Sequence, residues 1–211
     1  LRNIHLQKTE KESQIREFLE FNFTQTEFEN ILDKENFDLL KDLKIFSKCE
    51  EIIERLKNTI NYQMESFFEV NQTCCHLNIN ESTVLVREGI FKFLNFDNAF
   101  VVDPMWDIAI TSIQLKLTEL PIQESQFLNY YDEENFLFNK KRLEAFKDVA
   151  WKLMLHNLIK DFFYQVFIPV SESRRYRMLF LYETLRPFMN REFPGFNIVL
   201  DDIFGKFEEQ I

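Results

Sequence analysis

Two polar segments of this chain carry the residue types that metal-assisted chemistry on a phosphate uses. The first is HLNINEST, residues 76–83, and the second is LNFDNAFVVDPMWDIA, residues 94–109. Magnesium prefers oxygen ligands and is usually held by one or two carboxylates beside the phosphates of a substrate. Phosphoryl transfer needs such ions and a group that orients the attacking hydroxyl. The acids, amides and hydroxyls of the two segments could serve this chemistry if the fold brings them together.

The first segment has the spacing H-x-D-x-x-x-x-N, but with two of the three named positions changed. It begins at His76, and it has Asn78 at the Asp position and Thr83 at the Asn position. In kinase-type phosphotransferases the Asp of such a loop orients or deprotonates the hydroxyl, and the Asn binds a metal ion. The chemistry that the spacing indicates thus depends on residues that are replaced here.

A β-hairpin is predicted directly after this loop. β-Branched and aromatic residues lie on both sides of Glu88-Gly89, at residues 84–86 and 91–96. Such runs around a two-residue turn are typical of a hairpin with strands of roughly four to six residues. The hairpin would bring Asn95 and Asp97, near the end of its second strand, face to face with the loop.

Together the two segments resemble the C-terminal lobe of the aminoglycoside phosphotransferase and choline kinase superfamily. That lobe carries a loop like HGDLHPGNILV and a following stretch like IDFEYAGxGDPAWDLA, which DPMWDIA at residues 103–109 matches most specifically. LRNIH at residues 1–5 is similar to the Leu-x-x-Leu-His element that follows the family's N-terminal lobe. The resemblance covers residues 70–112 and extends in outline over residues 1–165. In the family the glycine loop and lysine belong to an N-terminal lobe, which the resemblance places outside these 211 residues; either that lobe has been removed or the protein does without it.

The resemblance implies a role for each matching position. The family's catalytic Asp falls on Asn78, its metal-binding Asn on Thr83, and its magnesium-binding Asp on Asn95. All three residue types are changed. The positions that fit the family pattern are His76, Asp97, Asp103, Trp106 and Asp107. The resemblance implies that His76 and Asp107 chiefly hold the loop in shape through hydrogen bonds.

The changed residues favour a protein that has lost catalysis. An amide cannot accept a proton near neutral pH as a carboxylate can, so Asn78 removes a general-base contribution of roughly 10²- to 10⁴-fold. A neutral carbonyl at Asn95 would hold magnesium weakly. We therefore expect a non-catalytic, pseudokinase-like member of the superfamily that serves as a binding or scaffolding domain for another protein or protein domain.

The alternative is an active ATP-dependent phosphotransferase. Thr83 could still offer a hydroxyl and Asp97 a carboxylate, so a degenerate magnesium site on Asp97, Asn95 and Thr83 stays open. The substrate would then be a small hydroxyl compound such as an amino sugar or a choline-like alcohol, with ATP and magnesium as cofactors. An acidic stretch at residues 119–134 would suit a cationic substrate, although solvated helix faces explain it more simply.

The composition excludes several classes of partner. A net charge of −10 and a pI near 4.9 argue against nucleic acid or an anionic membrane as the main partner. No apolar run approaches the roughly 20 residues of a membrane span, so a cytoplasmic protein is expected. The three cysteines include the adjacent pair Cys74-Cys75, which offers neither a disulfide framework nor a CxxC metal pair.

The elements that must position the site are mostly helices. With 25 Phe against three Gly and five Pro, we expect one mainly α-helical domain over residues 1–211 with a single small β-hairpin. The resemblance implies that this domain is of the kinase C-lobe type. The apolar periodicity predicts helices over residues 10–21, 26–32, 37–46, 48–70, 106–117, 139–166 and 172–186, with a short one from Pro121. Pro187 should end the helix before it, and Asp201-Asp202 should cap a last helix.

Two further motifs have open interpretations. SRRYR at residues 173–177 is either a phosphate grip or, more simply, a solvated helix start. His156 has no acid three or four residues away to tune it, and a packed or surface role is expected.

Overall fold

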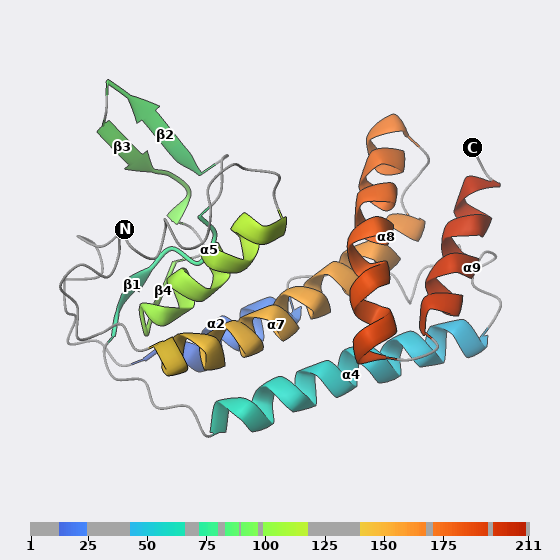
Figure 1. The fold of residues 1–211 in the computed structure, drawn as a ribbon, viewed down its shortest axis with the longest axis horizontal. Coiled ribbons are helices and arrows are strands. Elements are labelled where there is room, and N and C mark those ends of the chain that lie inside the picture. The colour runs from blue at the N-terminus through green and yellow to red at the C-terminus, as the bar shows by residue number, and fades with distance from the viewer. Residues whose placement is uncertain are drawn as a thin grey trace. The chain divides into compact units, whose positions relative to one another are not determined.

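The structure is a computed structural model that describes residues 13–24, 43–65, 72–79, 83–88, 90–96, 99–117, 140–167, 171–193 and 196–209. These residues form a mostly helical protein with two small antiparallel sheets (Figure 1). The helices are α2 (Ile15–Thr24), α4 (Leu43–Glu65), α5 (Met105–Leu117), α7 (Lys140–Phe167), α8 (Glu172–Glu192) and α9 (Phe196–Glu208). The strands are β1 (Thr73–Cys75), β2 (Val84–Arg87), β3 (Ile90–Phe93) and β4 (Phe100–Val102).

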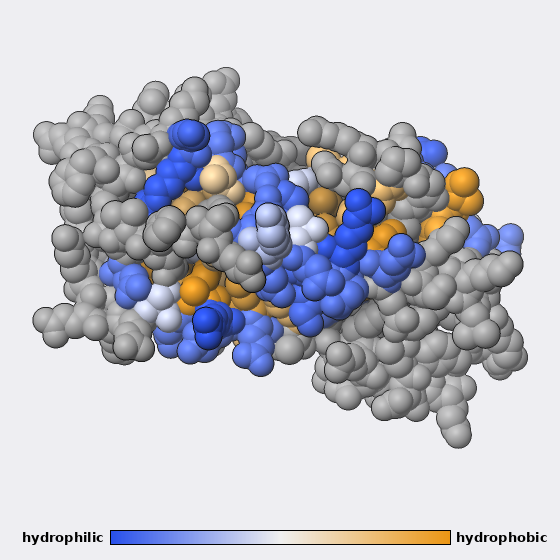
Figure 2. Space-filling view, turned by 90° about the horizontal axis from the view of Figure 1, so that it is seen from below, coloured by the Kyte–Doolittle hydropathy of each residue, from blue (hydrophilic) through white to orange (hydrophobic). Residues whose placement is uncertain are grey.

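Clustering of the chain gives two compact units. The first unit consists of Leu1–Phe21 and Gln63–Trp151, and the second of Asn22–Tyr62 and Lys152–Ile211. None of the described helices combines the length and the apolar composition that a membrane-spanning helix requires. The view in Figure 2 shows mainly hydrophilic side chains on the described part of that face, with hydrophobic ones between them.

The first unit contains both sheets. The predicted hairpin is confirmed, because β2 pairs antiparallel with β3 from Val84↔Phe93 to Arg87↔Ile90. A second pairing joins β1 to β4, with Cys74 opposite Val101, and the sequence analysis missed it. Three-residue strands are too short to show a period of two. The adjacent cysteines of β1 lie on opposite faces, since Cys74 is exposed and Cys75 is buried.

Aromatic side chains build the core of the first unit. The ring of Trp106, fully buried, packs edge-on against Phe18 and Phe146, with centroid distances of 5.3 and 5.2 Å. The start of α2 is attached to β4, because Gln14 donates its N–H to the carbonyl of Val101 and accepts the N–H of Val101 through its side chain. The other buried apolar residues of this unit are Leu19, Cys75, Val101, Val102, Met105, Ile108, Ala109, Ile113, Leu143, Val149 and Ala150.

The second unit is helical in its described part. Helices α8 and α9 pack together, and the ring of Tyr182 stacks on Phe204 at 4.2 Å while its hydroxyl donates to Asp201. The buried apolar residues are Leu56, Ile60, Leu153, Leu155, Ile159, Phe162, Met178, Leu181, Leu185, Val199, Leu200, Ile203 and Phe207.

Two predicted helix ends in this unit are wrong. Helix α8 continues through Pro187 to Glu192. A proline inside a helix removes one hydrogen bond and crowds the carbonyl one turn earlier. Pro187 is exposed and lies in the last turns of α8, and the helix continues through it. Asp201 and Asp202 lie inside α9 and do not cap it. Asp201 instead accepts from Tyr182 and lies 3.2 Å from the guanidinium of Arg186.

Other helix bounds shift by a few residues. Ser13 Oγ accepts the N–H of Ile15 as an N-cap, so α2 begins later than residue 10. Helix α4 begins at Leu43 and so includes the last residues of the helix expected over residues 37–46. No Gly or Pro separates that segment from the helix expected over residues 48–70, so the two form one helix. Helices α5 and α7 lie within one residue of their predicted bounds. The helices expected at residues 26–32 and from Pro121 lie outside the described residues.

The arginines of the SRRYR segment make more contacts within the protein than a solvated helix start would. Arg174 is 4% exposed, and its Nε donates to the carbonyl of Gln165 while its guanidinium lies over the ring of Phe207. Arg177 pairs with Asp161. These contacts give two of the three arginines a structural role in the second unit.

His156 is a packed histidine. It is 1% exposed, its ring meets Phe23 edge-on at 5.2 Å, and its Nδ1 lies 3.1 Å from Asn157 Oδ1. Its pKa is lowered to about 4, chiefly by burial; the hydrogen bond with Asn157 opposes this shift, and the nearby ammonium groups of Lys160 and Lys57 add to it. The ring is therefore neutral at pH 7 in the folded protein.

This burial predicts a loss of stability in mild acid. Between pH 6.5 and 4 the unfolded chain binds a proton at His156 that the folded chain does not bind, so the free energy of unfolding falls as the pH falls. From pH 7.5 to 5 this contribution is about 2 kcal/mol. Urea unfolding of the wild type and of His156→Gln at both pH values measures it. Parallel pH dependence in the two proteins would show that His156 does not titrate in this way.

Candidate functional site

The carboxylate of Asp107 holds the loop that begins at His76. Its Oδ2 accepts the backbone N–H of His76 at 2.8 Å, and its Oδ1 accepts that of Leu77 at 2.5 Å. Asp107 is 1% exposed, and Leu77 has a left-handed backbone with φ 62°. Because two adjacent N–H groups point at one carboxylate, the chain turns sharply after β1. This carboxylate belongs to α5, so α5 fixes the shape of the loop.

Helix α5 is itself fixed at its start. Asp103 lies just before the helix, its Oδ1 accepts the N–H of Met105 at 3.0 Å, and its backbone carbonyl accepts that of Trp106. Pro104 follows in the first helical position, where its missing N–H costs nothing. This is an N-cap, and it sets the direction in which α5 presents Asp107 one turn later.

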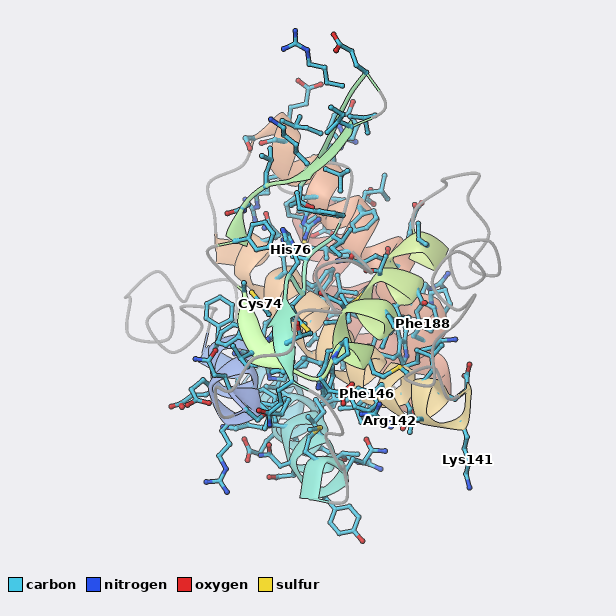
Figure 3. The ribbon with its side chains drawn as sticks, turned by 90° about the vertical axis from the view of Figure 1, so that its left-hand side faces the viewer. Cys74, His76, Lys141, Arg142, Phe146 and Phe188 are labelled. Atoms are coloured by element: carbon cyan, nitrogen blue, oxygen red, sulfur yellow. The ribbon has the colours of Figure 1, made fainter. Side chains whose placement is uncertain are left out.

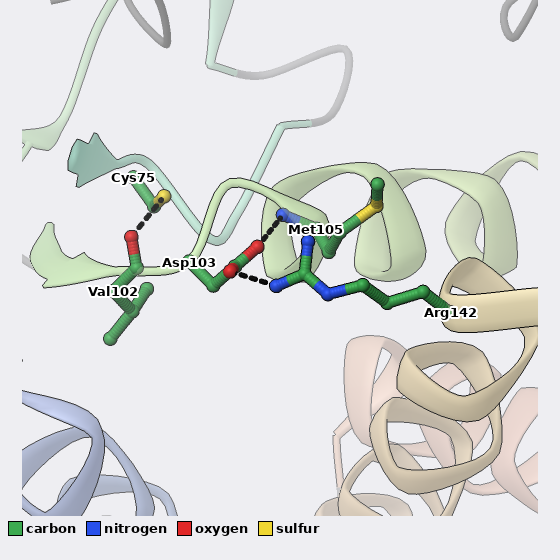
Figure 4. Close-up of polar contacts among 5 residues, drawn as sticks. All are labelled: Cys75, Val102, Asp103, Met105 and Arg142. Carbon is green, nitrogen blue, oxygen red and sulfur yellow. Dashed lines mark hydrogen bonds and ion pairs between the residues drawn. The ribbon is translucent and has the colours of Figure 1, made fainter. Parts of the chain in front are cut away.

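Arg142 of α7 neutralises the buried Asp103. Its guanidinium donates to Asp103 Oδ2, and Asp103 is fully buried while the Arg142 side chain is 19% exposed (Figure 4). The same guanidinium lies over the ring of Phe146, one turn along α7, at 5.1 Å from the ring centroid (Figure 3). An ion pair joins α7 to the start of α5 across 39 residues of sequence.

Cys75 adjoins these carboxylates. Its thiol donates to the carbonyl of Val102 at 3.5 Å (Figure 4). Burial raises the pKa of the Cys75 thiol well above its usual value, and the carboxylates of Asp107 and Asp103 raise it further. The thiol therefore stays protonated and serves as a small packed side chain.

His76 ties the loop to the hairpin. Its Nε2 lies 2.6 Å from the carbonyl of Leu94, and its ring meets Phe96 edge-on at 4.8 Å. Since a carbonyl can only accept, Nε2 carries the proton in this contact and Nδ1 is left as an acceptor. His76 is 2% exposed, and its Nδ1 has no hydrogen-bond partner within the described ranges.

The backbone around Leu94 gathers the three changed positions. The N–H of Leu94 donates to the carbonyl of Thr83 at 2.8 Å, while its carbonyl accepts from His76. The hydroxyl of Thr83 donates to the carbonyl of Asn78 at 2.9 Å. Asn95 follows Leu94, is exposed, and has φ 64°, a left-handed conformation that Asn tolerates better than most residues. Residues 78, 83 and 95 therefore lie together at the base of the hairpin.

The structure thus places most of the sequence-predicted residues in one region of the first unit. His76, Asp103 and Asp107 make the hydrogen bonds described above, and Trp106 fills the core beneath them. Asp97 lies outside the described residues. Across the part of the chain that the structure describes, no three His, Cys, Asp or Glu side chains are grouped so that they could hold a metal ion.

Two contributors were missed by sequence reasoning. Arg142 carries no local signal, because only the fold brings it to Asp103. Leu94 acts through its backbone, which no residue type reveals.

Comparisons with protein families, with curated proteins and with solved structures find no match to this chain.

Proposed function

We propose that this chain is a non-catalytic member of the aminoglycoside phosphotransferase and choline kinase superfamily, a pseudokinase-like C-terminal lobe that acts as a binding or scaffolding domain for another protein or domain. One observation carries the proposal. Thr83 accepts the N–H of Leu94 and donates to the carbonyl of Asn78, Asn95 follows Leu94 in the chain, and none of these three residues has a carboxylate.

The acids that remain nearby support this view. Asp107 accepts two backbone N–H groups, and Asp103 accepts from Arg142 and Met105. Both are almost fully buried, so their charges maintain the loop and the start of α5. Neither is placed to serve a phosphate. A general base and a magnesium carboxylate are the two groups that phosphoryl transfer would need here.

The hydroxyl of Thr83 is also engaged. Thr83 is 3% exposed, and its Oγ1 donates to the backbone carbonyl of Asn78. This contact closes the loop on itself. A buried hydroxyl used in this way is a poor substitute for a metal ligand that must face a substrate.

The hydrogen bonds that hold the loop support a binding role. A buried carboxylate with two N–H donors and a buried histidine on a carbonyl rigidify a loop and a hairpin base. A rigid surface binds a partner with little loss of conformational entropy. The proposal includes a cytoplasmic setting, which agrees with the free thiols of Cys74 and Cys75.

The alternative function is an ATP-dependent phosphotransferase for a small hydroxyl compound. The same hydrogen bonds are compatible with it. In that function Asp97, which lies outside the described residues, would have to supply the carboxylate of the magnesium site. Binding measurements separate the two functions.

Restoring the two carboxylates should create a cation site. We expect no binding heat when wild-type protein is titrated with Mg²⁺ and ATP, and clear Mg²⁺ binding by Asn78→Asp/Asn95→Asp, because two anionic oxygens would then meet beside Leu94. Isothermal titration calorimetry measures both. Asn58→Asp/Asn61→Asp adds the same charge on the exposed face of α4 and should bind no Mg²⁺. Saturable Mg-ATP binding by the wild type would contradict the proposal.

A further inference from the structure

The hairpin β2–β3 has one face that combines aliphatic and cationic side chains. Strand residues alternate between faces, so Leu85 and Arg87 of β2 share a face with their partners Lys92 and Ile90 of β3. Leu85 is 53% and Ile90 60% exposed, the Arg87 side chain is 90% exposed, and Lys92 is exposed. We name these four residues the hairpin face.

The hairpin face has a regular pattern. Leu85 lies opposite Lys92 and Ile90 opposite Arg87, so the two aliphatic side chains occupy one diagonal and the two cations the other. Diagonal neighbours on a sheet are about 7 to 8 Å apart at the backbone, within reach of one another's contacts. The face carries two positive charges in a chain whose net charge is −10.

Among the residues that the structure describes, the acid that approaches these cations is Glu88. Glu88, at the turn, approaches Arg87 only to 3.9 Å, and both side chains are more than four-fifths exposed. An ion pair with that geometry contributes little in water. The positive potential of the hairpin face therefore stays available to a partner.

The hairpin also exposes more apolar surface than a two-stranded sheet tolerates well. It projects away from β1, β4 and α5 within the first unit (Figure 1), and Val86 on the opposite face is 61% exposed. Two strands without a covering layer are marginally stable in water. Clustered exposed apolar side chains mark interaction sites in many proteins.

We propose that the hairpin face docks an acidic amphipathic segment of a partner protein, with two aliphatic or aromatic side chains on Leu85 and Ile90 and flanking Asp or Glu residues on Arg87 and Lys92. This inference rests on the proposed binding role, for which it names the surface and the partner chemistry. A second copy of the chain would bring the same cations against each other. An anionic membrane would bring an extended negative surface against the rest of the acidic chain, whereas a short acidic segment places its charges on Arg87 and Lys92 alone.

A displayed library of random 16-residue peptides tests the proposal on the 211-residue chain. Selection on wild-type protein, with counter-selection on Arg87→Glu/Lys92→Glu, should enrich peptides with excess Asp and Glu and apolar residues three or four apart. The best peptide is then labelled and measured by fluorescence anisotropy. Its affinity should fall at least tenfold for Leu85→Ser/Ile90→Ser and for Arg87→Glu/Lys92→Glu, and should weaken with salt.

Charge exchange provides the sharper readout. A peptide with Lys in place of each acid should bind Arg87→Glu/Lys92→Glu and not the wild type. Arg16→Glu/Lys141→Glu reverses two other exposed cations, one of which extends from α7 into solvent in Figure 3, and should leave binding unchanged. Circular dichroism checks that each variant is folded.

Several results would overturn the proposal: no enrichment, enriched peptides without acidic character, or binding that ignores all four substitutions. Binding of phosphatidylserine vesicles that requires the same four residues would assign the face to a membrane, and self-association that requires them would assign it to a second copy. The proposed loss of catalysis is measured separately with Mg-ATP, so either idea can fail alone.

Discussion

Arg142→Met lowers the free energy of unfolding by about 3 to 5 kcal/mol, the range for removing one partner of a buried ion pair. Asp103 is fully buried and would lose the guanidinium of Arg142 as its charged partner. The N-cap of α5 depends on the same carboxylate, so the helix that carries Asp107 should also lose order at its start. Chemical denaturation followed by circular dichroism measures the change.

A neighbouring residue and a double variant serve as controls. Lys141→Met removes an exposed charge one position earlier on α7 and should change stability by less than about 0.5 kcal/mol. Arg142→Met/Asp103→Asn removes both charges and should recover much of the loss, because no ion is then left unpaired. If the double variant loses as much free energy of unfolding as Arg142→Met and Asp103→Asn lose when added together, the two residues do not interact.

Asp107→Ala is expected to cost about 3 kcal/mol, because it leaves two N–H groups without their charged acceptor. The backbone groups affected are those of His76 and Leu77. Asp107→Asn should cost less, since its carbonyl still accepts one N–H while its amino group opposes the other. Hydrogen exchange of these two amides, together with urea unfolding, provides the measurement.

A local readout distinguishes this effect from general destabilisation. Exchange should accelerate at residues 76 and 77 by more than at the buried stretch 108–113 of α5. Glu144→Ala removes an exposed acid whose partner is Lys147 and should cost less than about 1 kcal/mol. Uniform acceleration of exchange across α5 and the loop would argue against a specific role of Asp107 in loop shape.

Sequence patterns predicted the elements that have strong local signals. The hairpin follows from β-branched and aromatic runs around Glu88, which takes the left-handed φ of 53° that such a turn requires. Helices α5 and α7 follow from apolar residues at helical spacing. Where a segment's own residues determine its structure, the prediction and the structure agree.

The failures have a different physical origin. Strands β1 and β4 exist because they pair with each other across 27 residues, which no local window contains. Helix α8 continues through Pro187, which is exposed and lies near its end, and Asp201 lies within α9, where it accepts from Tyr182 of α8. At the site, residue types suggested His76 and Asp107, while the contribution of Arg142 and the backbone of Leu94 required the fold.

We propose that the loop and hairpin keep their hydrogen bonds while the protein has lost phosphoryl transfer. The decisive assay is magnesium-dependent ATP turnover by the complete protein, with and without amino sugars and choline-like alcohols. We expect no turnover above the buffer rate, and no difference between the wild type and Asn95→Ala. Magnesium-dependent turnover that disappears in Asn95→Ala would contradict this proposal.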